Sequence, residues 1–216
     1  MALVRPGRCS PTLREELTLL KSGHTAVAGL DEAGRGAWAG PVYAAAVVLP
    51  IDNPDLPILL DGVRDSKQLN PRRREALLPA IQRVAQAAGV GWADAGEIDA
   101  QGIVRATELA MQRALGNLKS HVDVLLIDFM QLPDVDLPQR CLPKADIHCL
   151  SVAAASIVAK VSRDRIMVTM DERFPGYDFA SHKGYGTRAH QTALAELGPS
   201  PIHRKTWRPI QSLLGE

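Results

Sequence analysis

Short aliphatic runs separated by longer polar segments dominate the pattern along this chain. Residues 25–30, 42–49 and 122–128 have the length and the Val, Ala, Leu and Ile content of buried strands. Residues 90–93 and 145–149 predict two further short strands. Because these runs alternate with helical patterns, the chain predicts an α/β domain.

Helices are expected where apolar residues recur every three to four positions. Pro71 opens a helix that runs to about residue 88 and stops before Gly89. The segment 97–118 is helical with a break near Gly102, and Ser151 caps a long helix that ends near residue 174. Shorter helices are expected at 12–21 and 188–197, and a final segment follows at 209–214. Prolines and glycines predict loops at 50–70 and 133–143.

These elements divide the chain into three parts. Residues 1–22 are polar and mixed and predict an N-terminal extension, and residues 23–174 predict the main α/β domain. Residues 175–216 follow the Pro175-Gly176 break and predict a small helical extension. No internal repeat or low-complexity segment is present.

Composition narrows the class of protein. The 216 residues are 46% hydrophobic and 23% charged with a net charge of +1, which excludes a disordered chain and a simple polybasic nucleic-acid binder. A polyanion would have to bind at a local patch, and 4% aromatic residues disfavour a platform of many stacked rings. The apolar stretch 37–51 is too short to span a bilayer, and three unpaired-looking cysteines indicate a cytoplasmic protein.

Four acidic residues stand out because they adjoin predicted strands. Asp31 and Glu32 end one aliphatic run, Asp128 ends another, and Asp146 lies in a third. Carboxylates without a Cys or His cluster suit a hard cation, Mg²⁺ or Mn²⁺, and such sites perform phosphoryl chemistry. Ordinary turn and cap carboxylates are the alternative, and the adjacent Asp31 and Glu32 can share a site only if their strand ends or twists there.

Glycine and basic residues supply the second set of candidates. The Gly34-Arg35-Gly36 turn would let backbone amides approach a phosphate or sugar closely, although a hairpin turn explains it equally well. From residue 160 onward nine Lys and Arg face six acids, and Lys183 and Tyr185 suit a nucleic-acid backbone with a stacked sugar or base. Trp207 is expected in the core, and the histidines are expected at the surface or in structural hydrogen bonds.

Several motifs keep a fixed order along nearly the whole chain, roughly residues 25–210. They are GLDEAGRG at 29–36 with AGPV at 39–42, DSK at 65–67, LID at 126–128, SVAAASIVAKV at 151–161 with RDR at 163–165, HKGYGT at 182–187 with His190, and GPSPIHR at 198–204. In this order and content the chain resembles ribonuclease HII.

The resemblance implies a ribonuclease H-like fold, with a central mixed sheet flanked by helices and a C-terminal helical extension that binds substrate. It implies an endonuclease that cuts RNA in RNA–DNA hybrids and at single ribonucleotides in duplex DNA, leaving 3′-hydroxyl and 5′-phosphate ends. The protein is expected to be a monomer that does not associate with membranes. The cofactor would be Mn²⁺ or Mg²⁺. Under this resemblance the catalytic and metal-binding carboxylates are Asp31, Glu32, Asp128 and Asp146, and the substrate-binding residues are Gly34, Arg35, Gly36, Ser66, Lys67, Lys183 and Tyr185.

The chain departs from the family pattern at a few positions. Phe129 follows Asp128 where glycine is usual, Ala145 precedes Asp146 where glycine is usual, and Ala37-Trp38 replaces a pair such as Pro-Leu. One alternative is a non-catalytic nucleic-acid-binding module of the same fold. A phosphoesterase for small molecules is disfavoured because it would not need the basic tail. Residues 210–216 lack the paired aromatics of a sliding-clamp motif.

Overall fold

The computed structural model describes residues 10–215 and contains a five-stranded mixed sheet with strand order β3-β2-β1-β4-β5. The central strand β1 pairs antiparallel with β2 and parallel with β4, and β4 pairs parallel with β5. The carboxyl ends of β1, β4 and β5 therefore meet at one edge of the sheet. The strands are β1 (Val27–Ala33), β2 (Val42–Val48), β3 (Ala87–Ala93), β4 (Val124–Asp128) and β5 (Gln139–Leu142).

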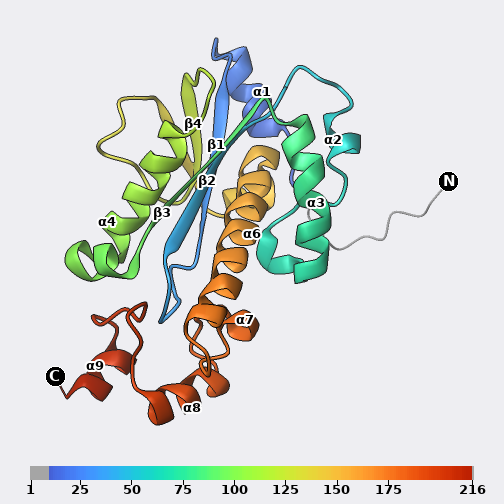
Figure 1. The fold of residues 1–216 in the computed structure, drawn as a ribbon. Helices are drawn as coiled ribbons and strands as arrows, with labels where there is room; N and C mark the ends of the chain where they lie inside the picture. The colour runs from blue at the N-terminus through green and yellow to red at the C-terminus, as the bar shows by residue number, and fades with distance from the viewer. Residues whose placement is uncertain (1–9, 216) are drawn as a thin grey trace.

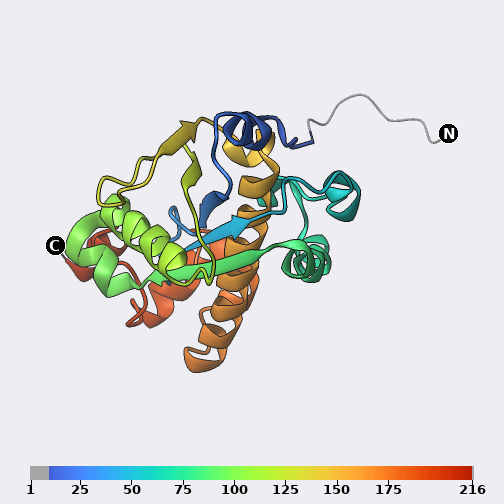
Figure 2. The ribbon, with the colours of Figure 1, turned by 90° about the horizontal axis from the view of Figure 1, so that it is seen from above.

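Helices cover both faces of the sheet (Figures 1 and 2). Helix α4 (Ala95–Gly116) packs on one face, while α6 (Leu150–Arg173) crosses the other with α3 (Pro71–Val84) packed on its outer side. No described helix is long and apolar enough to cross a membrane. The remaining helices are α1 (Arg14–Lys21), α2 (Leu56–Leu59), α5 (Ala145–His148), α7 (Phe179–His182), α8 (Arg188–Leu197), α9 (Arg208–Leu214) and the 3-10 turn η1 (Ser66–Gln68).

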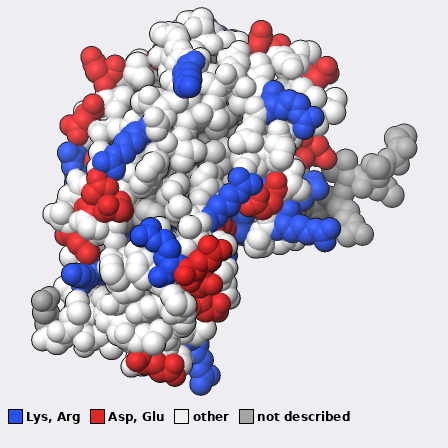
Figure 3. Space-filling model, in the orientation of Figure 1, with Lys and Arg blue, Asp and Glu red and all other residues white. Residues whose placement is uncertain are grey.

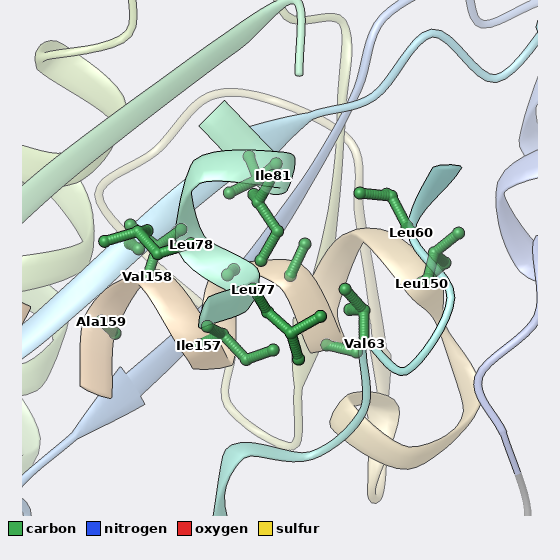
Figure 4. Close-up of a cluster of buried hydrophobic side chains, with 14 of the residues drawn as sticks. Leu60, Val63, Leu77, Leu78, Ile81, Leu150, Ile157, Val158 and Ala159 are labelled. Carbon is green, nitrogen blue, oxygen red and sulfur yellow. The ribbon is translucent and has the colours of Figure 1, made fainter. Parts of the chain in front are cut away.

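Alternation along β2 builds the two halves of the core. Val42, Ala44, Ala46 and Val48 belong to the cluster under α4, whereas Ala45 and Val47 belong to the cluster under α6 and α3. Successive strand residues point to opposite faces, so a strand buried on both sides reads as one continuous aliphatic run. Figure 4 shows the second cluster, in which Leu77, Leu78 and Ile81 of α3 meet Ile157 and Val158 of α6.

Helix α6 approaches β1 unusually closely because β1 carries glycine at the crossing point. A Cβ atom at Gly29 would lie 2.4 Å from the backbone carbon of Ser151. The first turn of α6 is also bound by a buried carboxylate, since Ser151 donates from its backbone nitrogen and its hydroxyl to Glu16 Oε1 at 2.9 and 2.8 Å. These contacts hold the start of α6 and helix α1 against the sheet.

The C-terminal helices α7 to α9 gather at the far end of α6 (Figure 1). Phe179, Ala193, Leu194 and Ile210 form a cluster there with Met167 of α6. Trp207 is partly buried and packs against this cluster and the one under α4, close to the core placement predicted for it.

Three histidines of this C-terminal part are buried and hydrogen-bonded, which confirms the structural role and excludes the surface placement. The Ser200 amide donates to His203 Nδ1 at 2.8 Å, so His203 Nε2 carries the proton shared with His190 Nε2 at 2.9 Å. His190 Nδ1 then donates to the Tyr185 carbonyl at 3.0 Å. Likewise, His182 accepts from the Gly184 amide and donates to the Tyr177 carbonyl. Backbone partners thus fix all three neutral tautomers.

Two sequence predictions are wrong. Residues 145–149 were expected as a strand, but Ala145–His148 forms α5, since five residues are too few for periodicity to separate helix from strand. The expected loop at 133–143 contains β5, because Gln139 bonds the backbone of Leu132 and returns the chain along the open edge of β4.

Other boundaries shift without changing the fold. The helix from Pro71 ends at Val84 instead of residue 88, and β3 begins at Ala87. The expected loop at 50–70 includes the single turns α2 and η1. The expected break in α4 is confirmed, since Gly102 has a φ of 81° and a ψ of 159°.

Candidate active site

The four predicted carboxylates lie around the carboxyl edge of β1 and β4. Pairing between β1 and β4 ends at Leu30 opposite Ile127, whereas pairing between β1 and β2 continues to Ala33. Asp31 and Glu32 therefore project beyond the last β4 pair, and Asp128 is the final residue of β4. Asp146 comes from the first turn of α5, which follows β5.

The sequence allows Asp31 and Glu32 to share a site if their strand ends or twists there, and strand β1 does not end between them. Both residues remain paired with β2. After burial, the charge of Glu32 is nevertheless the next cause of the raised pKa of Asp31.

Asp31 is the most strongly buried of the four, with 2% of its surface exposed. Its Oδ1 accepts the Glu32 backbone N–H at 2.8 Å, but its Oδ2 is buried without a hydrogen-bond partner. Burial and then the charge of Glu32 hold the pKa of Asp31 well above its usual range. A buried oxygen without a partner is costly, so this position fits a positively charged ligand.

Burial also raises the pKa of Glu32 and of Asp146, and in both cases the neighbouring Asp128 adds to the increase. Asp128 itself is oriented by the Ala145 amide, which donates to its Oδ1 at 3.1 Å. The site concentrates negative charge in a poorly solvated space, which is the arrangement that a divalent cation compensates.

Lys67 is the cation closest to these acids. Its Nζ lies 3.3 Å from Asp146 Oδ2, and although burial opposes the charged form, Asp31, Asp146 and Asp65 raise the pKa of Lys67 to about 12. The Lys67 side chain is 71% exposed, so it is free to reach a bound phosphate. Asp65 fixes the turn by accepting the Lys67 backbone N–H at 2.9 Å.

A cavity of about 520 Å³ adjoins the acids and receives most of the predicted substrate-binding residues. The Tyr185 ring lies on one side, with Lys160 Nζ 5.2 Å and Arg163 Cζ 5.3 Å from its centre. The residues that line the cavity are Glu32, Ala33, Gly34, Arg35, Gly36, Ser66, Lys67, Arg74, Lys160 and Tyr185.

Two predicted residues take different places from the rest. Lys183 does not line this cavity; it borders a neighbouring hollow with Glu75 and Arg165, and its Nζ bonds the Ala180 carbonyl. Ser66 lines the cavity, but its hydroxyl accepts from Ser156 of α6 at 2.8 Å. Ser66 therefore also joins the DSK turn to α6.

Sequence reasoning missed Lys160 and Arg74 as lining residues. Lys160 is held by Asp164 at 2.7 Å, and Arg74 donates to the Ser66 carbonyl at 2.9 Å. A helical-face argument would have found Lys160, since Ser156, Lys160 and Arg163 follow the i, i+4, i+7 spacing that places side chains on one face of α6. Arg74 carried no comparable signal.

The residues present fit a divalent metal ion by chemistry. Asp31 Oδ2 is buried without a partner, and the donor set consists of carboxylate oxygens. Among residues 10–215, however, no three His, Cys, Asp or Glu side chains are grouped closely enough to hold an ion. The carboxylates surround the site without being preassembled.

Charge on the visible surface is mixed. Figure 3 shows Lys and Arg interspersed with Asp and Glu over this face of the molecule. This agrees with a net charge of +1 and with the expectation that any polyanion binds at a local patch.

The departures from the family pattern leave these contacts in place. Ala145 is fully buried and still donates its amide to Asp128. Trp38 packs on the C-terminal part, where a Cβ at Gly186 would lie 2.2 Å from its ring. Phe129 adopts a φ of 62°, a conformation that glycine takes without strain, which explains why glycine suits this position.

Comparison with known proteins gives one consistent result. The family model described as Ribonuclease HII matches residues 28–210. Ribonuclease HII of Chloroflexus aggregans is 53% identical over 205 residues, which cover 95% of this chain and 97% of that protein. Ribonuclease HII of Roseiflexus castenholzii is 55% identical over 200 residues, which cover 93% of this chain and 89% of that protein.

Solved structures agree. Ribonuclease H2 from Pyrococcus horikoshii superposes with a TM-score of 0.70 at 29% identity, covering 88% of this chain and 97% of that one. The ribonuclease HII solved in complex with PCNA from Archaeoglobus fulgidus gives 0.69 at 28% identity, covering 85% and 96%. With the sheet topology, the carboxylate edge and the ordered motifs, these matches show that the chain belongs to the ribonuclease HII family.

Proposed function

We propose that this chain is an endonuclease that hydrolyses RNA in RNA–DNA hybrids and cuts at single ribonucleotides in duplex DNA. The observation that carries the proposal is the buried, unpartnered Oδ2 of Asp31 among four acids beside the Gly34–Gly36 turn. The products expected are 3′-hydroxyl and 5′-phosphate ends.

In this proposal Asp31, Glu32, Asp128 and Asp146 hold the divalent cation, Mg²⁺ or Mn²⁺. When bound, such a cation supplies Lewis-acid stabilisation of charge on the phosphodiester and a lowered pKa of water. The chain's own contribution is to exclude bulk solvent around Asp31, to hold Glu32 and Asp128 on strands β1 and β4, and to hold Asp146 in the first turn of α5.

The neighbouring residues position the substrate. Lys67, whose side chain is largely exposed, contacts the phosphate, and Tyr185 stacks on the adjacent sugar. The Gly34–Gly36 backbone contacts the ribose 2′-hydroxyl, the only group that distinguishes RNA from DNA at one nucleotide. A Cβ atom at Gly36 would meet no other atom within 4 Å, so there is room for a sugar to approach this residue.

Cleavage of a duplex with one ribonucleotide tests the proposal. Wild-type protein with Mg²⁺ or Mn²⁺ should cut beside the ribonucleotide, and Asp31→Asn should lower the rate by at least about 100-fold. Asp134→Asn is the matched control, because Asp134 is exposed and pairs with Arg105 away from the cavity. Absence of cutting by the wild type, or full activity of Asp31→Asn, would contradict the proposal.

A stability measurement separates lost chemistry from lost folding. In EDTA, Asp31→Asn removes a buried charge whose pKa is raised, so its melting temperature should equal or exceed that of the wild type. Duplex binding by the wild type without any cutting would favour the non-catalytic module instead.

A further inference from the structure

Two arginines next to the proposed site are fully buried, and every hydrogen bond found for them goes to a backbone carbonyl. Arg204 donates from Nε to Gly40 at 3.0 Å, and from its two terminal nitrogens to Arg35 and Gly34 at 2.7 Å each. No acidic side chain in the described part of the chain forms a salt bridge with it. Burial lowers the pKa of Arg204 to about 9, so its charge is kept at neutral pH.

Arg163 of α6 repeats the pattern from the other side. It donates to the carbonyls of Pro41 at 2.9 Å, Lys183 at 2.9 Å and Ala39 at 3.2 Å. It also packs under the turn, since a Cβ at Gly34 would lie 2.0 Å from Arg163 Nε. Glycine is therefore required at position 34, where φ is 93°, by Arg163 as well as by the turn.

The two arginines join loops that are far apart in sequence. The segments 34–41, 183–186 and 202–204 are further linked by backbone hydrogen bonds from Trp38 to Gly184, from Gly40 to Ile202 and from Arg204 to Trp38, at 2.8, 2.8 and 2.9 Å. Tyr185 lies within this unit. A displacement of one loop would therefore move the others.

The Gly34–Gly36 turn is held from one side only. Arg204 occupies the carbonyls of Gly34 and Arg35, while the amides of Arg35 and Gly36 donate to no acceptor within residues 10–215. The same residues line the cavity. The turn thus offers hydrogen-bond donors to a ligand that brings an acceptor such as a ribose hydroxyl.

We propose that Arg163 and Arg204 are positioning residues for ribonucleotide recognition. Arg204 holds the carbonyls of Gly34 and Arg35, while Arg163 packs under Gly34 and holds the adjoining loops, so that the free amides of the turn face the 2′-hydroxyl. The inference rests on the proposed function and names which residues make that recognition specific. Arginine is needed because its planar fork reaches several carbonyls at once, whereas lysine keeps the charge but not the fork.

Binding in EDTA tests the inference without cleavage. Arg204→Lys and Arg163→Lys are compared with the wild type for affinity to two duplexes that differ in one 2′-hydroxyl. A well-made hydrogen bond corresponds to about 5- to 10-fold in affinity. The wild type should prefer the ribonucleotide duplex by about this factor, and both variants should lose the preference while keeping their affinity for the all-DNA duplex within about threefold.

Matched controls separate positioning from general stability. Arg113→Lys also removes a guanidinium contact to a backbone carbonyl, that of Trp92 at 2.6 Å, but on the opposite side of the sheet from α6. Ile98→Val lowers stability from the core under α4 without touching the turn. Both should keep the ribonucleotide preference, and circular dichroism and melting curves confirm that each variant is folded.

The outcomes are distinct from those of the cleavage test. If both arginine variants fold and keep the wild-type preference, the inference is wrong even when the wild type cuts normally. If one variant does not fold, the other decides, because each arginine makes its own set of hydrogen bonds to the joined loops. If the wild type binds with the preference but does not cut, the proposed function fails while the positioning role stands.

Discussion

Phe129 stands beside the proposed site in a backbone conformation that favours glycine. It has a φ of 62° and a side chain that is 77% exposed, directly after Asp128. The left-handed conformation costs a non-glycine residue about 1–2 kcal/mol, and this exposed ring recovers little by burial. Its position is fixed instead by its backbone N–H, which donates to Leu142 at 3.2 Å.

We therefore predict that Phe129→Gly stabilises the protein. Relief of the left-handed strain outweighs the extra backbone entropy of glycine, about 0.5–1 kcal/mol, and leaves a net gain of roughly 0.5 kcal/mol. Urea denaturation measures the change, with Phe129→Ala, which keeps the strain, as the comparison. A glycine variant less stable than the alanine variant would show that the backbone entropy of glycine outweighs the relief of left-handed strain.

At the scale of elements, the buried histidines tie α7, α8 and the 200–203 turn together through neutral tautomers. Burial, and after it the neighbouring histidines, lowers the pKa of His190 and of His203 to about 4, although backbone hydrogen bonds act in the opposite direction. The unfolded chain titrates near 6.5. Between these values the unfolded state binds protons that the folded state does not.

The free energy of unfolding should therefore fall as pH decreases from about 6.5 to about 4, with no further loss from this pair below that. The shift corresponds to on the order of 3 kcal/mol for one histidine. Urea denaturation at several pH values, for the wild type and His203→Gln, isolates this contribution from that of the acids. Equal pH dependence of the two proteins would contradict the tautomer assignment.

The crossing of α6 over β1 gives a second prediction about elements. Gly29→Ala places a Cβ 2.4 Å from backbone atoms of Ser151, so α6 must shift, at a cost of about 2–4 kcal/mol. Gly116→Ala is the matched control, because an added Cβ there meets open space at the end of α4 and should be neutral or stabilising. In thermal denaturation, Gly29→Ala should lower the melting temperature clearly, whereas Gly116→Ala should leave it unchanged or raise it.

At the scale of the whole molecule, affinity for duplexes should depend on a local group of cations. Arg35, Lys67, Arg74 and Lys160 line one cavity on a protein of net charge +1.

Each phosphate contact adds about −0.9 to the slope of log affinity against log salt. Lys67→Met should reduce the magnitude of that slope by about 1, whereas Arg113→Met, outside the cavity, should leave it unchanged. Fluorescence anisotropy over a salt series measures both; equal slopes would mean that Lys67 makes no phosphate contact.

Much of this organisation could be predicted from sequence. Asp31 and Asp128 were identifiable because aliphatic runs end in acids and parallel strands end at one edge. The fate of the basic residues was not identifiable. Arg163 and Arg204 were counted among the basic residues that suit a nucleic-acid backbone, yet both are fully buried. Composition does not distinguish a cation that binds phosphate from one that binds backbone carbonyls.

Strand β5 and helix α5 were missed for a related reason. These segments are short and have weak local preferences, so tertiary contacts determine their secondary structure. Strand β5 forms because β4 offers an unpaired edge, and Asp128 accepts the first backbone N–H of α5. The proposed boundaries at residues 22 and 174 stay predictions, although Glu16 and His203 each contact the central part closely.

The length of helix α6 limits where this chain could accept an insertion. One continuous helix of 24 residues begins beside β1, carries Arg163 under the Gly34 turn and ends at the C-terminal helices. At 1.5 Å and about 100° per residue, inserting a single residue would both lengthen and rotate everything beyond it. The length of α6 therefore sets the distance and the rotation between its start beside β1 and the C-terminal helices.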